Sequence, residues 1–99
     1  MQALAQAPSL ASLRELQLDD ALLDDAALRA LASSPHLRSL QTLSFERNHA
    51  ISDDGIVMLA ESPVLANVRS LSLIGTGATE RGIATLPDHV AVKYGPFTL

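Results

Sequence analysis

Three histidines are the side chains that first suggest catalysis or metal binding in this chain. His36, His49 and His89 would serve as metal ligands or general bases if the fold brought them together. They occupy non-equivalent positions, and neither an H-x-x-x-H nor an H-E-x-x-H spacing occurs. A G-x-S-x-G segment, which would present a serine nucleophile, is also missing from the sequence. We therefore predict that the chain is not an enzyme and that these residues hold no metal.

The turn Gly75-Thr76-Gly77 stands between an apolar run and a predicted helix, as a phosphate-binding loop does. In the dinucleotide pattern G-x-G-x-x-G, the third glycine would fall at Glu80. Gly77 and Gly82 have the glycine spacing of a P-loop, but Ile and Ala follow where that loop needs Lys and Ser or Thr. We therefore expect neither a nucleotide nor any other cofactor.

A group of five carboxylates with no basic residue among its members lies near the N-terminus. It would suit a cation or a basic partner, but it contains no glycine-bearing twelve-residue calcium loop. Turn residues and a helix N-cap explain the same residue types, and we favour that interpretation. The group consists of Glu15, Asp19, Asp20, Asp24 and Asp25.

The composition argues against several classes of protein. The chain has 99 residues, no Cys, a net charge of −4 and only 3% aromatic residues. This length and cysteine count fit one small domain without disulfides. An acidic chain with few aromatics lacks the basic surface and the stacking side chains of a nucleic-acid binder. Since no apolar run is long enough to span a bilayer, we expect a cytoplasmic protein with neither a nucleic-acid nor a membrane partner.

The sequence repeats itself, and each repeat predicts a short strand. Pro8, Pro35 and Pro63 recur at intervals of 27 and 28 residues, and a pattern of the type L-x-x-L-x-L follows each of them. Side chains alternate along a strand, so the last two apolar residues of each pattern face the same side. The matching apolar residues are Leu13, Leu16 and Leu18, then Leu40, Leu43 and Phe45, then Val68, Leu71 and Leu73.

The second half of each repeat predicts a short helix. Apolar residues three apart mark one helical face, and a proline after each segment ends the helix. A Ser, Thr or Asp stands where an N-cap belongs, with an acidic residue after it. The apolar pairs are Leu28 and Leu31, Ile56 and Leu59, and Ile83 and Leu86, and the N-cap residues are Asp24, Ser52 and Thr79.

This unit of strand, turn and helix resembles the leucine-rich repeat family, in its ribonuclease-inhibitor-like class of 27–28 residues. The second unit matches best, at Leu40, Leu43, Phe45, Asn48, Ile51 and Gly55. The resemblance implies an α/β leucine-rich-repeat solenoid of about three full repeats, right-handed, with parallel strands on the concave face and short helices on the convex face. It spans 1–99 as a single domain: a partial repeat at 1–9, repeats at 10–36, 37–64 and 65–87, and a C-terminal strand and cap at 88–99.

In this family an Asn after each strand bonds the backbone of neighbouring coils. The matching positions here are Ala21, Asn48 and Thr76. The resemblance therefore implies that only Asn48 fills this role completely, and that the row of such residues is interrupted.

The residues that alternate with the inner ones would lie on the concave face. They are polar, are acidic toward the N-terminal side, and lack the density of Trp, Tyr and Arg that marks a tight binding surface. We take them as the candidate binding face: Glu15, Gln17, Asp19, Thr42, Ser44, Glu46, Arg47, Ser70, Ser72 and Ile74.

The N-terminal edge is a second candidate contact. The chain begins within what corresponds to the helix of a preceding repeat, so we expect no strand to cover the first coil. Its unpaired backbone and its apolar flank at Leu4, Leu10 and Leu13 would be open to a second copy or to another repeat chain. Two aromatic residues, Tyr94 and Phe97, instead suggest a cap at the C-terminal end.

These features together predict a non-catalytic protein–protein interaction module that uses the repeat surface, its open N-terminal edge, or both. The expected partner is another protein. It could be a second copy of this chain in a homodimer, or another repeat chain, bound through the N-terminal edge. The alternative is a C-terminal capping fragment of a longer repeat protein, or a bacterial effector, whose activity lies in another domain. The helix start at Ile51–Gly55 resembles that of repeat effectors.

Overall fold

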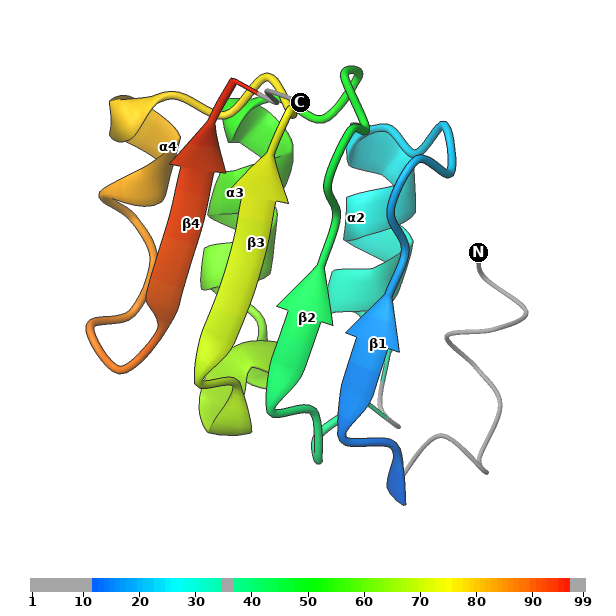
Figure 1. Cartoon of the computed structure of the whole chain (residues 1–99). Helices are drawn as coiled ribbons and strands as arrows, with labels where there is room; N and C mark the ends of the chain where they lie inside the picture. The colour runs from blue at the N-terminus through cyan, green and yellow to red at the C-terminus, as the bar shows by residue number, and fades with distance from the viewer. Residues whose placement is uncertain (1–11, 35–36, 97–99) are drawn as a thin grey trace.

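The computed structural model describes residues 12–34 and 37–96. In this part of the chain, short parallel strands alternate with helices (Figure 1). The elements are β1 (Glu15–Gln17), α2 (Asp25–Ala32), β2 (Thr42–Ser44), α3 (Asp53–Ala60), the 3₁₀ helix η2 (Pro63–Asn67), β3 (Ser70–Ile74), α4 (Glu80–Ile83) and β4 (Ala91–Gly95). The predicted partial repeat at 1–9, His36 and the end of the predicted cap at 97–99 lie outside the described residues.

The strands form one parallel sheet in the order β1-β2-β3-β4. Leu16 pairs with Leu43 and Leu43 with Leu71, so the first three strands are in register at intervals of 27 and 28 residues. Val92 of β4 pairs with Leu71 after a shorter return, since α4 has only four residues. The predicted fourth strand is therefore confirmed, and it extends the same sheet.

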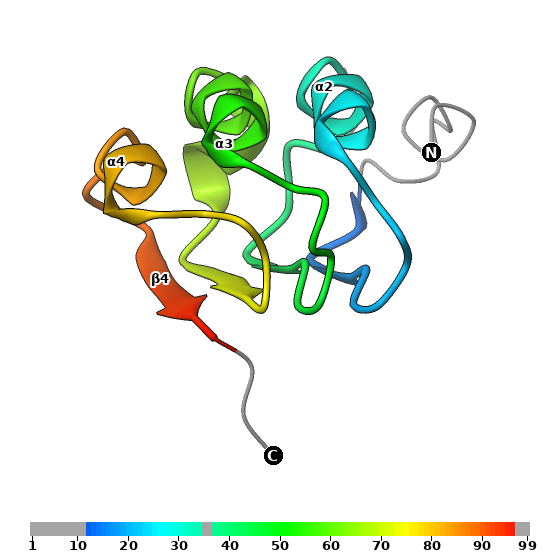
Figure 2. The same ribbon diagram turned by 90° about the horizontal axis from the view of Figure 1, so that it is seen from above.

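The helices α2, α3 and α4 all lie on one face of the sheet, and the opposite face carries no helix of the described residues (Figure 2). Neighbouring helices contact each other in the same order as the strands do. The predicted α/β class is thus confirmed as a two-layer arrangement of helices on a parallel sheet. Parallel sheets are usually covered on both faces, so the helix-free face is a feature that calls for an explanation.

The core lies between the sheet and the helices. The inner residues predicted by the strand alternation and by the helical spacing are buried in the second and third strand segments and in α2 and α3. Complete burial of one such side chain contributes roughly 1.5–3 kcal/mol to folding. The residues at these positions are Leu43, Phe45, Leu71, Leu73, Leu28, Leu31, Ile56 and Leu59.

The first unit is less buried than the two that follow it. Leu13, Leu16 and Leu18 are half-buried and pack against the end of the core. Among the described residues, no strand lies beyond β1, so within this part of the chain these side chains have a neighbouring strand on one side only. The middle of the sheet is therefore better packed than its first strand.

Aspartates link the N-termini of successive helices. Asp25, in the first turn of α2, accepts a hydrogen bond from the backbone N–H of Ser52 at 2.8 Å and a second one from the Ser52 hydroxyl. A Cβ atom at Gly55 would lie 2.3 Å from Asp25 Oδ1, so the glycine leaves the space that this carboxylate fills. Asp53 and Thr79 repeat the arrangement between α3 and α4.

This linkage corrects the prediction for two of the N-caps. Ser52 and Thr79 precede their helices as predicted, but their side chains accept no hydrogen bond from those helices. Their hydroxyls donate to the preceding helix instead, because the carboxylate there lies within reach. Asp24 does cap its own helix, by accepting a hydrogen bond from the backbone N–H of Ala27 at 3.0 Å.

Asn48 ties its own turn to the unit before it. Its side-chain oxygen accepts hydrogen bonds from the backbone N–H groups of Ala21 and Leu23, both at 3.0 Å. Its side-chain nitrogen donates to the carbonyl oxygens of Leu18 and Phe45, both at 2.9 Å. Asn48 is almost completely buried, so these four bonds supply the partners that its side-chain amide would otherwise find in water.

Thr76 stands at the matching position one unit later and bonds only within its own turn. Its hydroxyl donates to the carbonyl oxygen of Leu73 at 2.8 Å and accepts from the backbone N–H of Ala78 at 3.2 Å. The predicted interruption is therefore confirmed: of the three matching positions, only Asn48 bridges two units.

Candidate binding surface on the helix-free face

The residues predicted for the binding face form columns across the helix-free side of the sheet. The strand register aligns one residue of each strand with the next, so equivalent side chains stand side by side. The columns are Glu15, Thr42 and Ser70 in one, and Gln17, Ser44 and Ser72 in the other. Glu15 and Gln17 are exposed, whereas Thr42 and Ser70 are half-buried.

The second column is bonded to acidic residues of the preceding units. The hydroxyl of Ser44 donates to Asp19 Oδ1 at 2.5 Å, and the hydroxyl of Ser72 donates to Glu46 Oε2 at 2.6 Å. Asp19 Oδ1 also accepts a hydrogen bond from the backbone N–H of Glu46 at 2.8 Å.

These bonds correct the prediction that both serines are open to a partner. Ser44 is only 7% exposed and Ser72 only 9% exposed, so their side chains are buried despite their place on the helix-free side. Each serine hydroxyl is taken by the carboxylate of the preceding unit. A partner on this face would therefore meet the half-buried carboxylates of Asp19 and Glu46 rather than the serines.

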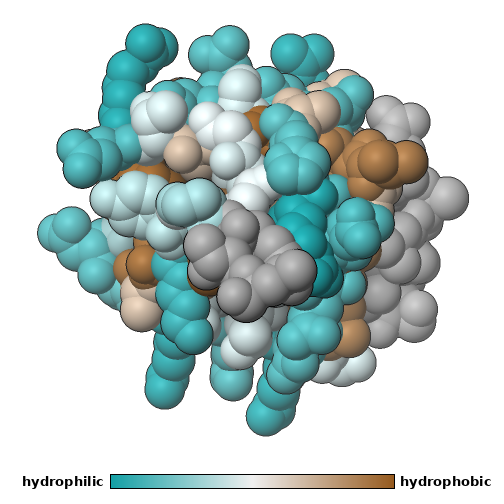
Figure 3. Space-filling model, turned by 45° about the horizontal axis from the view of Figure 1, so that its top comes forward, coloured by the Kyte–Doolittle hydropathy of each residue, from teal (hydrophilic) through white to brown (hydrophobic). Residues whose placement is uncertain are grey.

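A shallow hollow of about 460 Å³ lies where the strands end. Asp20, Arg47 and Gly75 line it, and all three have left-handed backbone, with φ of 51°, 62° and 78°. This conformation turns the chain out of each strand toward the following helix. Figure 3 is turned toward this end, and the face in view is mainly hydrophilic, with hydrophobic side chains in separate small patches. Arg47 and Ile74, the last two predicted face residues, are half-buried here.

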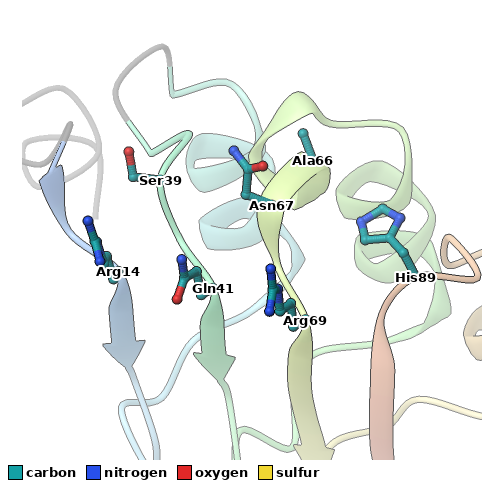
Figure 4. A pocket seen from close by; sticks show the side chains of 7 residues that line it. All are labelled: Arg14, Ser39, Gln41, Ala66, Asn67, Arg69 and His89. Atoms are coloured by element: carbon teal, nitrogen blue, oxygen red, sulfur yellow. The ribbon is translucent and has the colours of Figure 1, made fainter.

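A larger hollow of about 630 Å³ lies at the opposite edge, where the strands begin (Figure 4). Two arginines give it a cationic character, and no acidic side chain is among the described residues that line it. The lining residues are Arg14, Ser39, Gln41, Ala66, Asn67, Arg69 and His89. We call this site the strand-start hollow.

Backbone hydrogen bonds fix the floor of the strand-start hollow. Arg14, Gln41 and Arg69 each come directly before a strand, so they occupy equivalent positions in three successive units. The carbonyl oxygen of Arg14 accepts from the N–H groups of Gln41 and Thr42, at 2.7 and 3.0 Å. The carbonyl oxygen of Gln41 accepts from the N–H groups of Arg69 and Ser70, at 2.8 and 3.2 Å. The three side chains therefore start from a rigid and regularly spaced backbone.

Two further hydrogen bonds fix the wall of the strand-start hollow. Asn67 Nδ2 donates to the carbonyl oxygen of Arg38 at 2.7 Å. His89 Nε2 lies 2.8 Å from the carbonyl oxygen of Leu65, and since a carbonyl only accepts, Nε2 carries the proton. Both side chains are thereby held to the backbone of other segments.

The residues of the strand-start hollow do not stand out in the sequence. The residue before each strand belongs neither to the repeated apolar positions nor to the positions taken as the binding face. The signal was nevertheless present, because Arg14 and Arg69 occupy the same place in the first and third repeats. His89, which was considered as a metal ligand, belongs to this hollow, whereas His49 lines the hollow at the other end of the strands.

The predicted contact at the N-terminal edge is described only in part. Leu13 is half-buried and packs against the core beside the edge strand β1. Leu4 and Leu10 lie outside the described residues. The edge therefore stays a prediction that rests on Leu13 and on the backbone of β1.

Residues 12–34 and 37–96 contain no group of three or more His, Cys, Asp or Glu side chains placed to hold a metal ion. Within the same ranges, every helix is too short or too polar to cross a membrane.

Comparison of the chain with protein-family models, with curated proteins and with solved structures found no match. What the chain does is therefore inferred from its own surfaces and packing.

Proposed function

We propose that the chain is a short right-handed solenoid of the leucine-rich repeat type, and that it serves in the cytoplasm as a non-catalytic protein-interaction module. Three observations support the fold assignment. The first three strands are in register at intervals of 27 and 28 residues, the helices all lie on one side, and Asn48 bridges two units. Repeating units of this kind bury a continuous core only by stacking on one another.

The helix-free face of the parallel sheet is the single observation that carries the functional proposal. A parallel sheet normally has both faces covered, and here the described residues cover only one (Figure 2). A partner protein placed against the other face would complete the usual three-layer arrangement. Glu15, Gln17, Thr42 and Ser70 would contact such a partner, together with the carboxylate of Glu46.

The N-terminal edge is the second surface of the proposed module. Strand β1 is an edge strand among the described residues, and Leu13 beside it is only half-buried. An uncovered strand edge offers backbone N–H and C=O groups to another strand. A second copy of the chain would satisfy both edges at once in a two-fold dimer.

A second candidate is a C-terminal end piece of a longer repeat protein, including a bacterial effector, with its activity in another domain. The taper toward β4 favours this candidate, because α4 has only four residues and β4 follows sooner than the other strands do. Another feature argues against identical units stacked on α2. Ala27 stands where α3 has Gly55. An aspartate placed against α2 as Asp25 is placed against α3 would therefore meet a Cβ, as it would if Gly55 carried one.

Photo-cross-linking tests the proposed module directly. A benzoylphenylalanine residue placed at Thr42 or Ser70 samples the helix-free face, and one placed at Ala26 or Asp54 samples exposed positions in the helices. Irradiation in cells that produce the protein, followed by mass spectrometry, identifies the neighbours of each position. The proposal expects one discrete protein product from Thr42 and Ser70. Discrete products from the helix positions alone would overturn it.

A further inference from the structure

We propose that the strand-start hollow binds an acidic peptide segment of the partner protein, with the side chains of Arg14 and Arg69 holding its carboxylates. This inference rests on the proposed function, because it names the chemistry of the partner that the helix-free face would bind. The hollow adjoins that face along the chain, since Arg14, Gln41 and Arg69 directly precede the face residues Glu15, Thr42 and Ser70.

The spacing of the two arginines suits an extended chain. Arg14 and Arg69 precede β1 and β3, so their Cα atoms are separated by two strand spacings, or about 10 Å. Carboxylates on residues i and i+2 of an extended peptide lie on one side, about 7 Å apart. Both arginine side chains are exposed and long enough to bend toward each other, so that their guanidinium groups can match the shorter spacing of the two carboxylates. Gln41 stands between them and presents an amide that pairs with a peptide group of the ligand (Figure 4).

The chemistry of arginine favours a carboxylate ligand. A guanidinium group presents parallel N–H donors that match the two oxygens of a carboxylate. The hollow is open and lined mainly by polar groups, with Asn67 and His89 already bonded to backbone carbonyls. An open polar site of this kind fits a chain segment that passes across it rather than an enclosed apolar ligand.

The charge of the surroundings gives the proposed site its selectivity. The chain carries a net charge of −4, so most of its surface repels an acidic segment. Glu15 and Asp88 are exposed next to the hollow in sequence, but neither is among the residues that line it. An acidic segment is therefore attracted at the strand-start hollow and repelled beside it, which favours binding at this one position.

Binding of a labelled synthetic peptide to the full chain tests the inference. The peptide alternates Glu and Gly and carries three glutamates, and its matched control has Gln in place of Glu. Fluorescence anisotropy measures the affinity, and amide chemical shifts of the ¹⁵N-labelled protein locate the site. We expect the Glu peptide to bind, the Gln peptide not to bind, and the shifts to centre on Arg14, Gln41 and Arg69.

Charge-matched variants show whether the arginines are responsible. Arg14→Gln combined with Arg69→Gln should weaken peptide binding at least about tenfold, since two charge-assisted hydrogen-bonded pairs are lost. Arg29→Gln combined with Arg81→Gln removes the same charge from exposed positions in the helices and should change the affinity less than about twofold. Circular dichroism of both variants verifies that each is folded.

Three results would overturn the inference: equal binding of the Glu and Gln peptides, unchanged binding by the Arg14 and Arg69 variant, or tighter binding of a single-stranded oligonucleotide through the same arginines. These three results concern the acidic-peptide site alone. The proposed module is tested separately, by cross-linking from Thr42 and Ser70. A cross-linked partner together with no peptide binding would refute the acidic-peptide site and leave the module standing.

Discussion

Asp53, in the first turn of α3, accepts two hydrogen bonds from Thr79, the residue that precedes α4. The backbone N–H of Thr79 lies 2.7 Å from Asp53 Oδ1, and the Thr79 hydroxyl lies 2.5 Å from Asp53 Oδ2. The hydroxyl bond is the main reason why the pKa of Asp53 lies below its ordinary value of 3.8, and the backbone bond and the charge of Arg81 lower that pKa further. One carboxylate therefore joins two successive helices most strongly when it is ionised.

The first prediction concerns the pH dependence of this link. Because folding lowers the pKa of Asp53, its contribution to stability is present above pH 3.8 and is lost as the pH falls through the folded pKa. Asp53→Asn should therefore destabilise the protein at pH 7, and the difference from wild type should shrink progressively as the pH falls below 3.8. Urea denaturation over a series of pH values measures this difference, with the exposed neighbour Asp54→Asn as the control. A difference that grows on acidification would contradict the assignment.

The second prediction concerns the glycine that faces the same kind of link one unit earlier. Ala is about 1 kcal/mol better than Gly in a helix interior, yet a Cβ at Gly55 would displace the Asp25 carboxylate from Ser52. Two charged hydrogen bonds at about 1.5–3 kcal/mol each are at stake, so Gly55→Ala should destabilise the protein by about 2–5 kcal/mol after the gain in helix propensity is subtracted. On an Asp25→Ala background the same change should cost much less. Equal costs on the two backgrounds would show that Asp25 is not what the glycine accommodates.

The third prediction concerns the buried amide that bridges the first two units. Asn48→Ala leaves two backbone N–H groups and two carbonyls without their partner and should cost about 3 kcal/mol or more. Thr76→Ala removes bonds within one turn only and should cost about 1 kcal/mol. Thermal or chemical denaturation compares the two variants. A larger loss for Thr76→Ala would mean that the bridge between units contributes little.

The fourth prediction concerns the middle of the core. Leu43 is 1% exposed and pairs with Leu16 on one side and Leu71 on the other, so the structure around it has little freedom to collapse. Leu43→Ala should therefore cost about 2–5 kcal/mol through lost transfer energy and the cavity left behind. Leu13→Ala at the half-buried edge is the matched control and should cost less. Denaturation midpoints equal to that of wild type for Leu43→Ala would show that the strand register is wrong.

The strands and the inner residues were predictable because their signals are local and repeated. Alternation in each L-x-x-L-x-L segment identified Leu43 and Leu71 as inner residues, and the recurring spacing predicted parallel neighbours. Three copies of one pattern support each other, so chance similarity at one of them matters little. The helix positions Leu28 and Ile56 were predictable for the same reason.

The contacts between units were not predictable from the residue types alone. Ser52 has the side chain of an N-cap, but its hydroxyl partner is Asp25, which lies 27 residues earlier in the chain. The burial of Ser44 likewise depends on a carboxylate of the previous unit, 25 residues away. In each case the partner belongs to the preceding unit, so only the stacking of the units brings the hydroxyl within reach of it.

The affinity of the cross-linked partner for surface variants tests the central claim most directly, namely that the helix-free face is the binding surface. Thr42→Trp places a large side chain in the middle of that face without adding charge, and Ala26→Trp places the same side chain on α2. If the helix-free face binds the partner, Thr42→Trp should weaken the affinity at least about tenfold, and Ala26→Trp should leave it within about twofold. The opposite pattern, with binding lost by Ala26→Trp and kept by Thr42→Trp, would place the partner on the helices and contradict the claim.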